Sequence, residues 1–367
     1  VVASDADAAM DRLESFALVD SIIGRGKTKL SLRLRPGLQV DLRAVPAESF
    51  GAALQYFTGS MEHNVVLRGR AKAQGLKINE YGVFRGERSI AGRTEEEVYA
   101  ALGLPCFPPE LREARREFDW ADAGELPRLV ELSDIRGDLH THSTYTDGAA
   151  TIEEMALAAK QRGLKYIAVT DHSKRVSMVG GLDGGRLLEQ WDEIERLNRR
   201  LRGIAVLKGI EVDILEQGGL DLPDDVLARA DWVVASVHYG QRQSRDRLTR
   251  RVIEALENPH VSAIGHPTGR MLLQRKAYDI DLEAVMRAAR DNGKCLELNA
   301  HPVRLDLDDV GCAMARNHGV RVVISTDAHS PDGLDAMRCG VQQARRGGLT
   351  PADVANTRPW REVKPRK

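Results

Sequence analysis

The spacing of apolar and polar positions divides this chain into two parts. From about residue 134 onward, short apolar runs alternate with stretches whose apolar residues recur at helical spacing, such as 152–162 and 282–291. Alternation of this kind predicts parallel strands that are joined by crossover helices. The apolar runs lie at 135–139, 165–170, 204–210, 232–237, 261–265, 294–299 and 321–326.

The first part of the chain has shorter and more varied elements. Residues 29–34 and 38–43 alternate apolar and polar positions around a Pro36-Gly37 turn, which predicts two paired strands. Helical patterns follow near 47–57 and 61–75. A capping box from Thr94 to Glu97 then opens a further short helix.

Prolines and charged residues separate the two parts. Pro105, Pro108 and Pro109 interrupt the chain, and the charged, irregular residues 110–132 resemble an interdomain connection. The tail from Arg358 to Lys367 is basic and is expected to fray. We therefore predict a small domain at 1–112, a linker at 113–133 and a strand–helix domain at 134–367.

The composition of the chain indicates the class of protein and its cellular location. The chain has 367 residues, of which 42% are hydrophobic and 29% charged, and a formal net charge of −1. These values are ordinary for a globular protein, and no apolar run approaches the length of a membrane span. The first residues lack the pattern of a signal peptide, and the absence of an initiator Met predicts that the chain begins inside a longer protein. The sparse cysteines show no zinc-type spacing, which favours a reducing, cytoplasmic location.

One local stretch departs from this neutral balance. Residues 65–90 contain six cationic and two acidic side chains, and six minus two leaves a surplus of four positive charges. Such a surplus suits contact with phosphates, but a solvated basic face has the same composition. The cations are Arg68, Arg70, Lys72, Lys77, Arg85 and Arg88, and the acids are Glu80 and Glu87.

Histidines and acids follow the predicted strands of the second part. His140 and His142 alternate along one strand, so both side chains point to the same side. Since parallel strands end at one edge, nine such residues converge there, which favours a closed or nearly closed barrel of seven strands over an open sheet. The predicted metal ligands are His140, His142, Asp147, His172, Glu211, His238, His266, Asp327 and His329.

Nine ligands of this kind predict more than one metal ion. A zinc ion takes about four ligands, so the set suits two or three ions if a carboxylate such as Glu211 bridges them. Mixed imidazole and carboxylate ligands favour zinc, manganese or iron over calcium or magnesium. We leave His260 and His318 out, because a surface or capping role explains each of them. His301 lies near the end of the sixth strand and is left out because the ligand set is full without it.

Clustered divalent ions suit the hydrolysis of phosphate esters. One ion lowers the pKa of a bound water, and another offsets charge on the phosphoryl and leaving oxygens. Glu211 and Asp327 are therefore predicted to be catalytic through the metals. Arg304 and Asn299, which follow the sixth strand, are predicted to contact the substrate phosphate.

The order of these motifs resembles that of the polymerase and histidinol phosphatase (PHP) domain over roughly 134–355. The resemblance implies a distorted seven-stranded (β/α) barrel with three metal ions. It would assign His140, His142, Glu211 and Asp327 to the first ion. The second ion would take Glu211, His238 and His266, and the third would take Asp147, His172 and His329. The motifs that carry the resemblance are His140-Thr-His142, Thr170-Asp171-His172, Gly209-Ile-Glu211, Ser236-Val-His238, Ile264-Gly-His266-Pro267 and Thr326-Asp327-Ala-His329.

The first part of the chain carries a second set of motifs, which are Asp41-Leu-Arg43-Ala-Val-Pro46, Tyr56-Phe57-Thr58-Gly59-Ser60, Asn64, Arg68 and Ile78-Asn79-Glu80-Tyr81. This set resembles the palm-to-thumb segment of a family X DNA polymerase. It implies an α+β partial palm and thumb, and the tandem with a PHP barrel is similar to bacterial family X polymerases.

This resemblance implies a role for each matching residue. Asp41 would be the third catalytic carboxylate, which helps to hold the Mg²⁺ or Mn²⁺ that activates the primer hydroxyl. Tyr56 and Phe57 would sense the sugar of the incoming nucleotide, and Gly59 would let the backbone approach it. Asn64 and Arg68 would face the nascent base pair and the template.

The chain lacks part of the family's pattern. Polymerase chemistry needs three carboxylates, and the other two should precede residue 1. Asp5 and Asp7 do not replace them, because they follow the expected strand in a start that is predicted to be a loop. We therefore expect an N-terminally truncated family X polymerase, in which dNTP binding and synthesis belong to the full-length protein.

The favoured hypothesis is a Mn²⁺- or Zn²⁺-dependent 3′–5′ exonuclease that acts in DNA repair on gapped, nicked or single-stranded 3′ ends. By the resemblance, 3′-phosphatase and abasic-site cleavage activities would accompany it, and the protein would be a monomer that binds no membrane. The alternatives are a small-molecule phosphomonoesterase of the histidinol phosphatase type, a DNA-binding module with an idle barrel, and an amidohydrolase. An amidohydrolase would place its bridging ligand on a different strand from Glu211.

Overall fold

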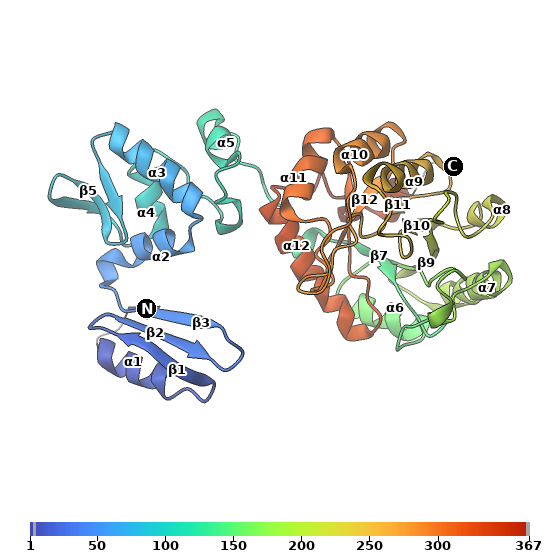
Figure 1. Cartoon of the computed structure of the whole chain (residues 1–367), viewed down its shortest axis with the longest axis horizontal. Coiled ribbons are helices and arrows are strands. Elements are labelled where there is room, and N and C mark those ends of the chain that lie inside the picture. Colours follow the sequence, from blue (N-terminus) through green and yellow to red (C-terminus); the bar gives the residue numbers. More distant parts are fainter. Residues whose placement is uncertain (3–4, 365–367) are drawn as a thin grey trace. The chain divides into compact units, whose positions relative to one another are not determined.

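The computed structural model describes residues 1–2 and 5–364 and divides the chain into two compact units, Val1–Leu126 and Pro127–Lys367 (Figure 1). Each unit has its own hydrophobic core. No helix among the described residues is long and apolar enough to cross a membrane.

Unit 1 begins with helix α1 and a three-stranded antiparallel sheet in the order β1-β2-β3. The predicted pairing of residues 29–34 with 38–43 is confirmed, since Leu30 of β2 lies opposite Leu42 of β3. Met10 of α1 packs with Leu30 and Leu32 to form a small core. The elements are α1 (Ala6–Glu14), β1 (Val19–Arg25), β2 (Lys29–Leu34) and β3 (Gln39–Arg43).

The start of the chain is helical, which corrects the expectation of a loop around Asp5 and Asp7. Asp5 is the N-cap of α1, and its carboxylate accepts a hydrogen bond from the Ala8 amide at 2.9 Å. Asp7 lies in the first turn, where an acid is favourable because the free amides of a helix start carry partial positive charge.

The rest of unit 1 packs helices against a second small antiparallel sheet, in the order β4-β5-β6. The predicted helices near 47–57 and 61–75 are confirmed as α2 and α3. Within the predicted linker, α5 places Phe118 in this core beside Phe107. The elements are α2 (Phe50–Thr58), α3 (Met61–Ala73), β4 (Lys77–Asn79), β5 (Gly82–Arg85), β6 (Arg88–Ala91), α4 (Glu95–Ala100) and α5 (Glu117–Ala123).

A buried hydrogen-bond network ties α3 to α5. His63 Nδ1 lies 2.8 Å from Glu117 Oε1, and His63 Nε2 lies 2.9 Å from the Tyr99 hydroxyl. The Glu117 carboxylate also accepts from the amides of Ala114 and Arg115, at 2.7 and 2.9 Å. Burial raises the pKa of Glu117, but His63 and these amides outweigh it and hold the pKa below its usual range. The ionised carboxylate therefore stabilises unit 1.

Replacing Glu117 with glutamine is expected to lower the free energy of unfolding of unit 1 by about 1–3 kcal/mol at pH 7, because the buried donors lose a charged acceptor. A carboxylate whose folded pKa is depressed adds stability above its unfolded pKa, and that stability is lost as the pH falls through the folded pKa. The difference between wild type and E117Q should therefore shrink at acidic pH. Hydrogen exchange of the α3 amides at pH 7 and pH 3 measures this difference in stability. The control is Glu125→Gln, which changes an exposed acid. An equal difference at both pH values would contradict this account.

Unit 2 is a barrel of seven parallel strands in the order β7-β8-β9-β10-β11-β12-β13. The two edge strands meet at their carboxyl ends, where the Asp327 amide donates to the His140 carbonyl at 3.0 Å and the His142 amide donates to the Ala328 carbonyl at 2.9 Å. The predicted fold class is confirmed. The strands are β7 (Gly137–Thr141), β8 (Tyr166–Val169), β9 (Ala205–Asp213), β10 (Trp232–Ser236), β11 (Ala263–Ile264), β12 (Cys295–Asn299) and β13 (Val322–Ser325).

Helices lie around the outside of these strands (Figure 1). Since both faces of the strands are buried, the strands read as continuous apolar runs rather than as alternating patterns. The helices are α6 (Ile152–Gln161), α7 (Gly184–Arg200), α8 (Asp224–Leu227), α9 (Arg245–Glu257), α10 (Leu282–Asp291), α11 (Asp309–His318), α12 (Met337–Arg346) and α13 (Trp360–Val363).

Apolar side chains fill the barrel interior below the carboxyl ends of the strands. Trp232 of β10 and Tyr166 of β8 pack there with Val363 of α13 and the ring of Trp360. Burial of Val363 corrects the expectation that the tail frays from Arg358, and residues 365–367 lie outside the described part of the chain. The closed end of the barrel is thus packed, and polar chemistry is confined to the other end.

Candidate metal centre

Six histidines and three acids meet at the carboxyl end of the barrel. His140 and Glu211 lie within strands β7 and β9, and the other seven residues lie in the loops that directly follow strands. All nine are the residues that the sequence singled out as metal ligands. Their side chains are buried except those of Asp147, His238 and His329, which are partly open to solvent.

Glu211 lies at the centre of this group. Its Oε2 is 2.8 Å from His172 Nδ1 and 3.4 Å from His140 Nε2. Its Oε1 is 3.0 Å from His266 Nε2 and 3.3 Å from His238 Nε2. One carboxylate therefore faces four imidazoles, the arrangement expected of a ligand that bridges two ions.

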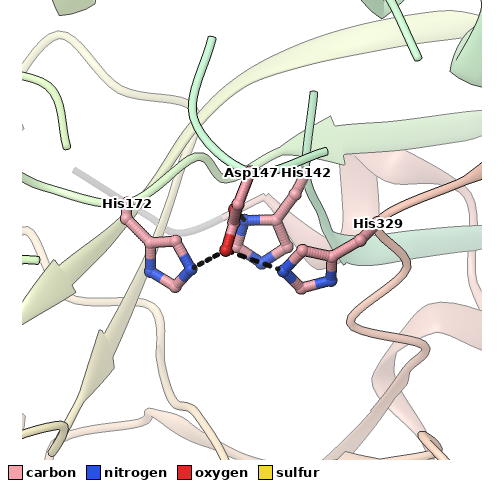
Figure 2. A group of neighbouring side chains, drawn as sticks. All are labelled: His142, Asp147, His172 and His329. Carbon is pink, nitrogen blue, oxygen red and sulfur yellow. Dashed lines mark ion pairs between the residues drawn. The ribbon is translucent and has the colours of Figure 1, made fainter. Parts of the chain in front are cut away.

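Asp147 is the centre of a second group of possible ligands, which lies nearer the surface. Figure 2 shows its carboxylate between the rings of His172 and His329, with His142 behind. Asp147 Oδ2 is 3.4 Å from the Nε2 atoms of both His172 and His329, and Asp147 Oδ1 is 3.8 Å from His142 Nδ1. These four residues place one ligand atom each within 4.8 Å of the others, so they can hold one ion.

Asp327 is the centre of a third group of possible ligands. Its Oδ1 is 3.0 Å from His142 Nε2 and 3.6 Å from His140 Nε2. The ligand groups that the geometry supports are thus His142, Asp147, His172 and His329; His140, His142 and Asp327; and His172, Glu211 and His238. His142 and His172 each belong to two of these groups, whereas the family resemblance gave each of them to one ion.

The donor atoms in this pocket fit metal ions better than they fit one another. Among the described residues, buried atoms without a hydrogen-bond partner include His140 Nε2, His142 Nδ1, His172 Nδ1 and Glu211 Oε2. A buried polar atom without a partner costs free energy, so a cluster of them indicates a missing ligand. Each nitrogen offers a lone pair to a divalent cation once its ring is neutral, and the carboxylate oxygen offers one directly.

Charge in the pocket is balanced between acids and histidines. Burial raises the pKa of Glu211, but His238, His140 and His172 outweigh it and hold the pKa well below its usual range. Burial lowers the pKa of His172, yet Glu211 and Asp147 bring it to about 10. A proton on His172 therefore supplies positive charge that a divalent cation would supply in its place.

A buried acid behind His140 was missed from the sequence. Glu297 of β12 lies 2.7 Å from His140 Nδ1, and its Oε2 accepts from the His266 amide at 2.6 Å. Because a carboxylate only accepts, Nδ1 carries the proton and Nε2 keeps its lone pair toward Glu211 and Asp327. The signal was present, since an acid inside the apolar run Cys-Leu-Glu-Leu-Asn needs a buried partner.

Asp171 is a second supporting acid that the sequence analysis did not single out. It accepts hydrogen bonds from the Ser143 hydroxyl at 2.5 Å, from the Thr146 hydroxyl at 2.6 Å and from Gln190 Nε2 at 2.6 Å. These bonds fix the loop that carries Asp147 beside His172. Its place in the Thr-Asp-His motif directly before His172 was the available signal.

The two residues predicted to contact phosphate differ in the structure. Asn299 is fully buried, and its amide nitrogen donates to Asp327 Oδ2 at 3.0 Å, so it orients Asp327 and cannot reach a substrate. Arg304 is partly exposed, with Nε 3.4 Å from the same oxygen. Arg304 thus keeps its predicted place beside the pocket, and the prediction for Asn299 was wrong.

Two of the predicted ligands have a backbone that residues other than glycine rarely adopt. His266 has φ of 28° and Asp327 has φ of 55°. Positive φ costs free energy for such residues and persists where the surroundings impose it. The amide contacts of His266 with Glu297 and of Asp327 with the His140 carbonyl impose it here.

The predicted polymerase residues lie in unit 1. Asp41 on β3 is partly exposed, 3.3 Å from Lys29 Nζ. The Phe57 ring at the end of α2 lies 4.5 Å below the Arg43 guanidinium, and the two residues line a cleft of about 410 Å³ with Asp41. Tyr56 packs edge-to-face on Phe57, with ring centroids 5.1 Å apart.

Other predicted residues of unit 1 differ in accessibility. Arg68 is exposed on α3, and Gly59 has φ of 70°, a value that favours glycine. Asn64 is buried, and its amide bonds Gln55 Nε2 at 2.7 Å and the Tyr56 carbonyl at 2.8 Å. Asn64 therefore fixes the end of α2, while Arg68 is free to meet a ligand.

Both units of the chain match known protein families. Residues 53–113 match the DNA polymerase beta thumb family, and residues 138–301 match the PHP domain family. The "DNA polymerase/3'-5' exonuclease PolX" of Bacillus subtilis is 42% identical over 99% of this chain, and the chain spans 64% of that protein's length.

Further relatives match a smaller share of this chain. A "Probable phosphatase" of Thermoanaerobacter sp. is 31% identical over 60% of this chain and 89% of its own length. The crystal structure of histidinol phosphate phosphatase from Lactococcus lactis, complexed with zinc, L-histidinol and phosphate, aligns with a TM-score of 0.39 at 16% identity, over 57% of this chain and 93% of that one. The chain therefore belongs to the PHP-domain family, and its PHP barrel follows a thumb of the family X DNA polymerase type.

Proposed function

We propose that the barrel is a metal-dependent phosphodiesterase that removes nucleotides from DNA 3′ ends as a 3′–5′ exonuclease in DNA repair. The observation that carries the proposal is the convergence of nine metal-ligand side chains around Glu211, in a chain whose other unit matches a DNA polymerase thumb. The name of the Bacillus subtilis relative, which includes both activities, supports it.

The proposed ions are Mn²⁺ or Zn²⁺, and the ligands of each ion are those that the family resemblance assigns. His142 and His172 each lie within reach of two neighbouring ligand groups. When bound, such ions lower the pKa of a water and offset charge on phosphoryl oxygens. Arg304, beside Asp327, would bind a phosphoryl oxygen and orient the ester. Water adds to the terminal phosphorus, the bond from phosphorus to the 3′ oxygen breaks, and that oxygen leaves with a proton. The products are a nucleoside 5′-monophosphate and a strand shortened by one nucleotide.

The residues of unit 1 are proposed to serve DNA and nucleotide binding. The cleft beside Asp41 and Phe57 would take the sugar of a dNTP in a polymerase that also holds the other two carboxylates, with Tyr56, Gly59 and Asn64 shaping its wall. Arg68 would contact the template strand. The free cysteines support a reducing, cytoplasmic setting, and we propose a monomer.

Removal of metal tests the proposal. Dialysis against a chelator is expected to lower the release of nucleotides from a 3′-labelled single-stranded oligonucleotide by at least about a hundredfold, because the hydrolytic water loses its activation. Added Mn²⁺ or Zn²⁺ should restore the rate, with two or three ions bound per chain by mass spectrometry. Full activity of a protein that contains no metal would refute the proposal.

A second candidate is a phosphomonoesterase that acts on small molecules. The Thermoanaerobacter relative favours it, because its name is "Probable phosphatase" and 89% of its length matches this chain. Measurement of kcat/KM for an oligonucleotide and for histidinol phosphate at the same enzyme concentration separates the two. A higher value for the small monoester would replace the exonuclease proposal.

A further inference from the structure

The two most exposed large apolar side chains of the described residues lie on loops at the mouth of the barrel. Leu273 is 108% exposed and Met178 is 89% exposed relative to a free residue. Leu273 comes seven residues after His266, and Met178 comes six residues after His172. Since both loops leave the carboxyl ends of parallel strands, both tips lie on the rim around the metal centre.

The loop that carries Leu273 is held in place. Met271 and Arg275 pair across a tight turn, and the Leu272 amide donates to the Val303 carbonyl at 2.6 Å. Arg270 anchors the base of the turn by donating to the carbonyls of Arg304 and Leu305. The same segment carries Arg304, so the turn is fixed to the wall of the metal pocket.

The loop that carries Met178 is braced in a similar way. The Leu182 amide donates to the His172 carbonyl at 2.8 Å and so closes the loop. The Arg175 amide donates to Asp221 Oδ2 at 2.6 Å, and Arg186 Nη1 donates to the Gly180 carbonyl at 2.7 Å. An apolar tip that is fixed in solvent leaves its apolar surface without a partner in the chain.

The charge of both loops complements a nucleic acid. Neither residues 173–182 nor residues 267–278 contain an acid. Lys174 and Lys276 are exposed, and the described part of the chain offers neither an ion pair. The arginines of the same loops are engaged, since Arg175 pairs with Glu216, Arg270 pairs with Asp308 and Arg275 donates to the Gly269 carbonyl. A groove of about 610 Å³ beside the turn is lined by apolar side chains such as Met271 and Leu272 and by Arg270 and Lys276. Its one acid, Asp308, pairs with Arg270. That volume is large enough for a nucleotide.

We propose that the loops 173–182 and 267–278, here called the rim loops, bind the unpaired bases of a DNA strand whose 3′ end enters the metal centre. This inference rests on the proposed exonuclease function and names the form of its substrate. Leu273 and Met178 pack on the faces of unpaired bases, and the unpaired cations contact the phosphates between them. Bases inside a duplex are stacked and offer no free face, so the rim loops select single-stranded 3′ ends.

Two substrates separate base binding from hydrolysis. The first is a single-stranded oligonucleotide with a labelled 3′ end, and the second is bis(4-nitrophenyl) phosphate, a small diester without bases. The measured quantity is the ratio of the two kcat/KM values for the intact chain. The double substitution Leu273→Ala and Met178→Ala is expected to lower this ratio about tenfold, because each lost contact weakens base binding.

A matched control is Leu157→Ala, which removes an exposed leucine from α6 on the outside of the barrel and should leave the ratio within twofold of wild type. Lys276→Ala gives an independent measure, since it should raise KM for the oligonucleotide and reduce the salt dependence of binding. A ratio within twofold of wild type in both rim variants, with both substrates hydrolysed, overturns the rim inference and leaves the exonuclease proposal standing. A wild type that hydrolyses the small diester but no oligonucleotide overturns the exonuclease proposal itself.

Discussion

Replacement of Glu211 by glutamine is expected to lower exonuclease kcat/KM by at least about a thousandfold, equivalent to about 4 kcal/mol. The amide keeps the shape of the side chain but removes the charge that faces His140, His172, His238 and His266. In the proposed assignment Glu211 bridges two ions, and a side chain without charge would hold two cations poorly, so the affinity for both ions should fall together. Steady-state kinetics and metal analysis of the same preparation measure the two effects.

A suitable control is Glu195→Gln, which changes an exposed acid paired with Lys208 on the outside of the barrel. This control should keep wild-type activity and metal content. If E211Q bound the full complement of metal and lost no more than a few-fold in rate, Glu211 would not be a bridging ligand. Retention of the rate without the metal would show that the reaction does not use this centre.

Replacement of Glu297 by glutamine should weaken metal binding by about 10–100-fold, because Glu297 orients His140 without touching a metal. Glutamine can present its amide nitrogen to His140 Nδ1, which favours the tautomer whose Nε2 carries the proton. Metal titration with competing chelators measures the affinity. Excess metal should recover most of kcat in E297Q and little of it in E211Q.

That difference in rescue distinguishes a supporting acid from a ligand. Glu297→Asp, which keeps the charge, should recover part of the affinity if the hydrogen bond to His140 is the cause. The exposed Glu283 of α10 provides the control as Glu283→Gln, for which no change is expected. An E297Q protein with wild-type metal affinity would mean that packing alone orients His140.

The barrel was predictable because its strands are buried on both faces. Continuous apolar runs such as Val233 to Val237 differ from the surrounding amphipathic helices, and their order along the chain is also their order in the sheet. The hairpin of β2 and β3 was predictable from local alternation. The helix at Asp5 was missed, because Met10 is its one fully buried side chain among the described residues, with Ala6 and Leu13 partly buried beside it, and such a short helix shows little periodicity.

The convergence of the nine side chains was predictable for a related reason. Imidazoles and carboxylates are rare at the ends of apolar runs, and parallel strands bring those ends together. Whether a residue supports a ligand depends on the direction of its side chain rather than on its position in the sequence. Asn299 and Arg304 both follow β12, yet one side chain points into the interior toward Asp327 and the other remains partly open.

The sequence by itself determined that the chain has two domains, that the second is a parallel barrel, and which nine side chains meet at its mouth. These conclusions follow from the apolar runs and from the residues at their ends, which local physics controls. Only the tertiary structure decided that Glu297 and Asp171 support the pocket, that His142 and His172 lie between neighbouring ligand groups, and that Leu273 and Met178 stand on the rim. Such facts depend on side-chain direction and on contacts between residues far apart in the chain, which no local pattern records.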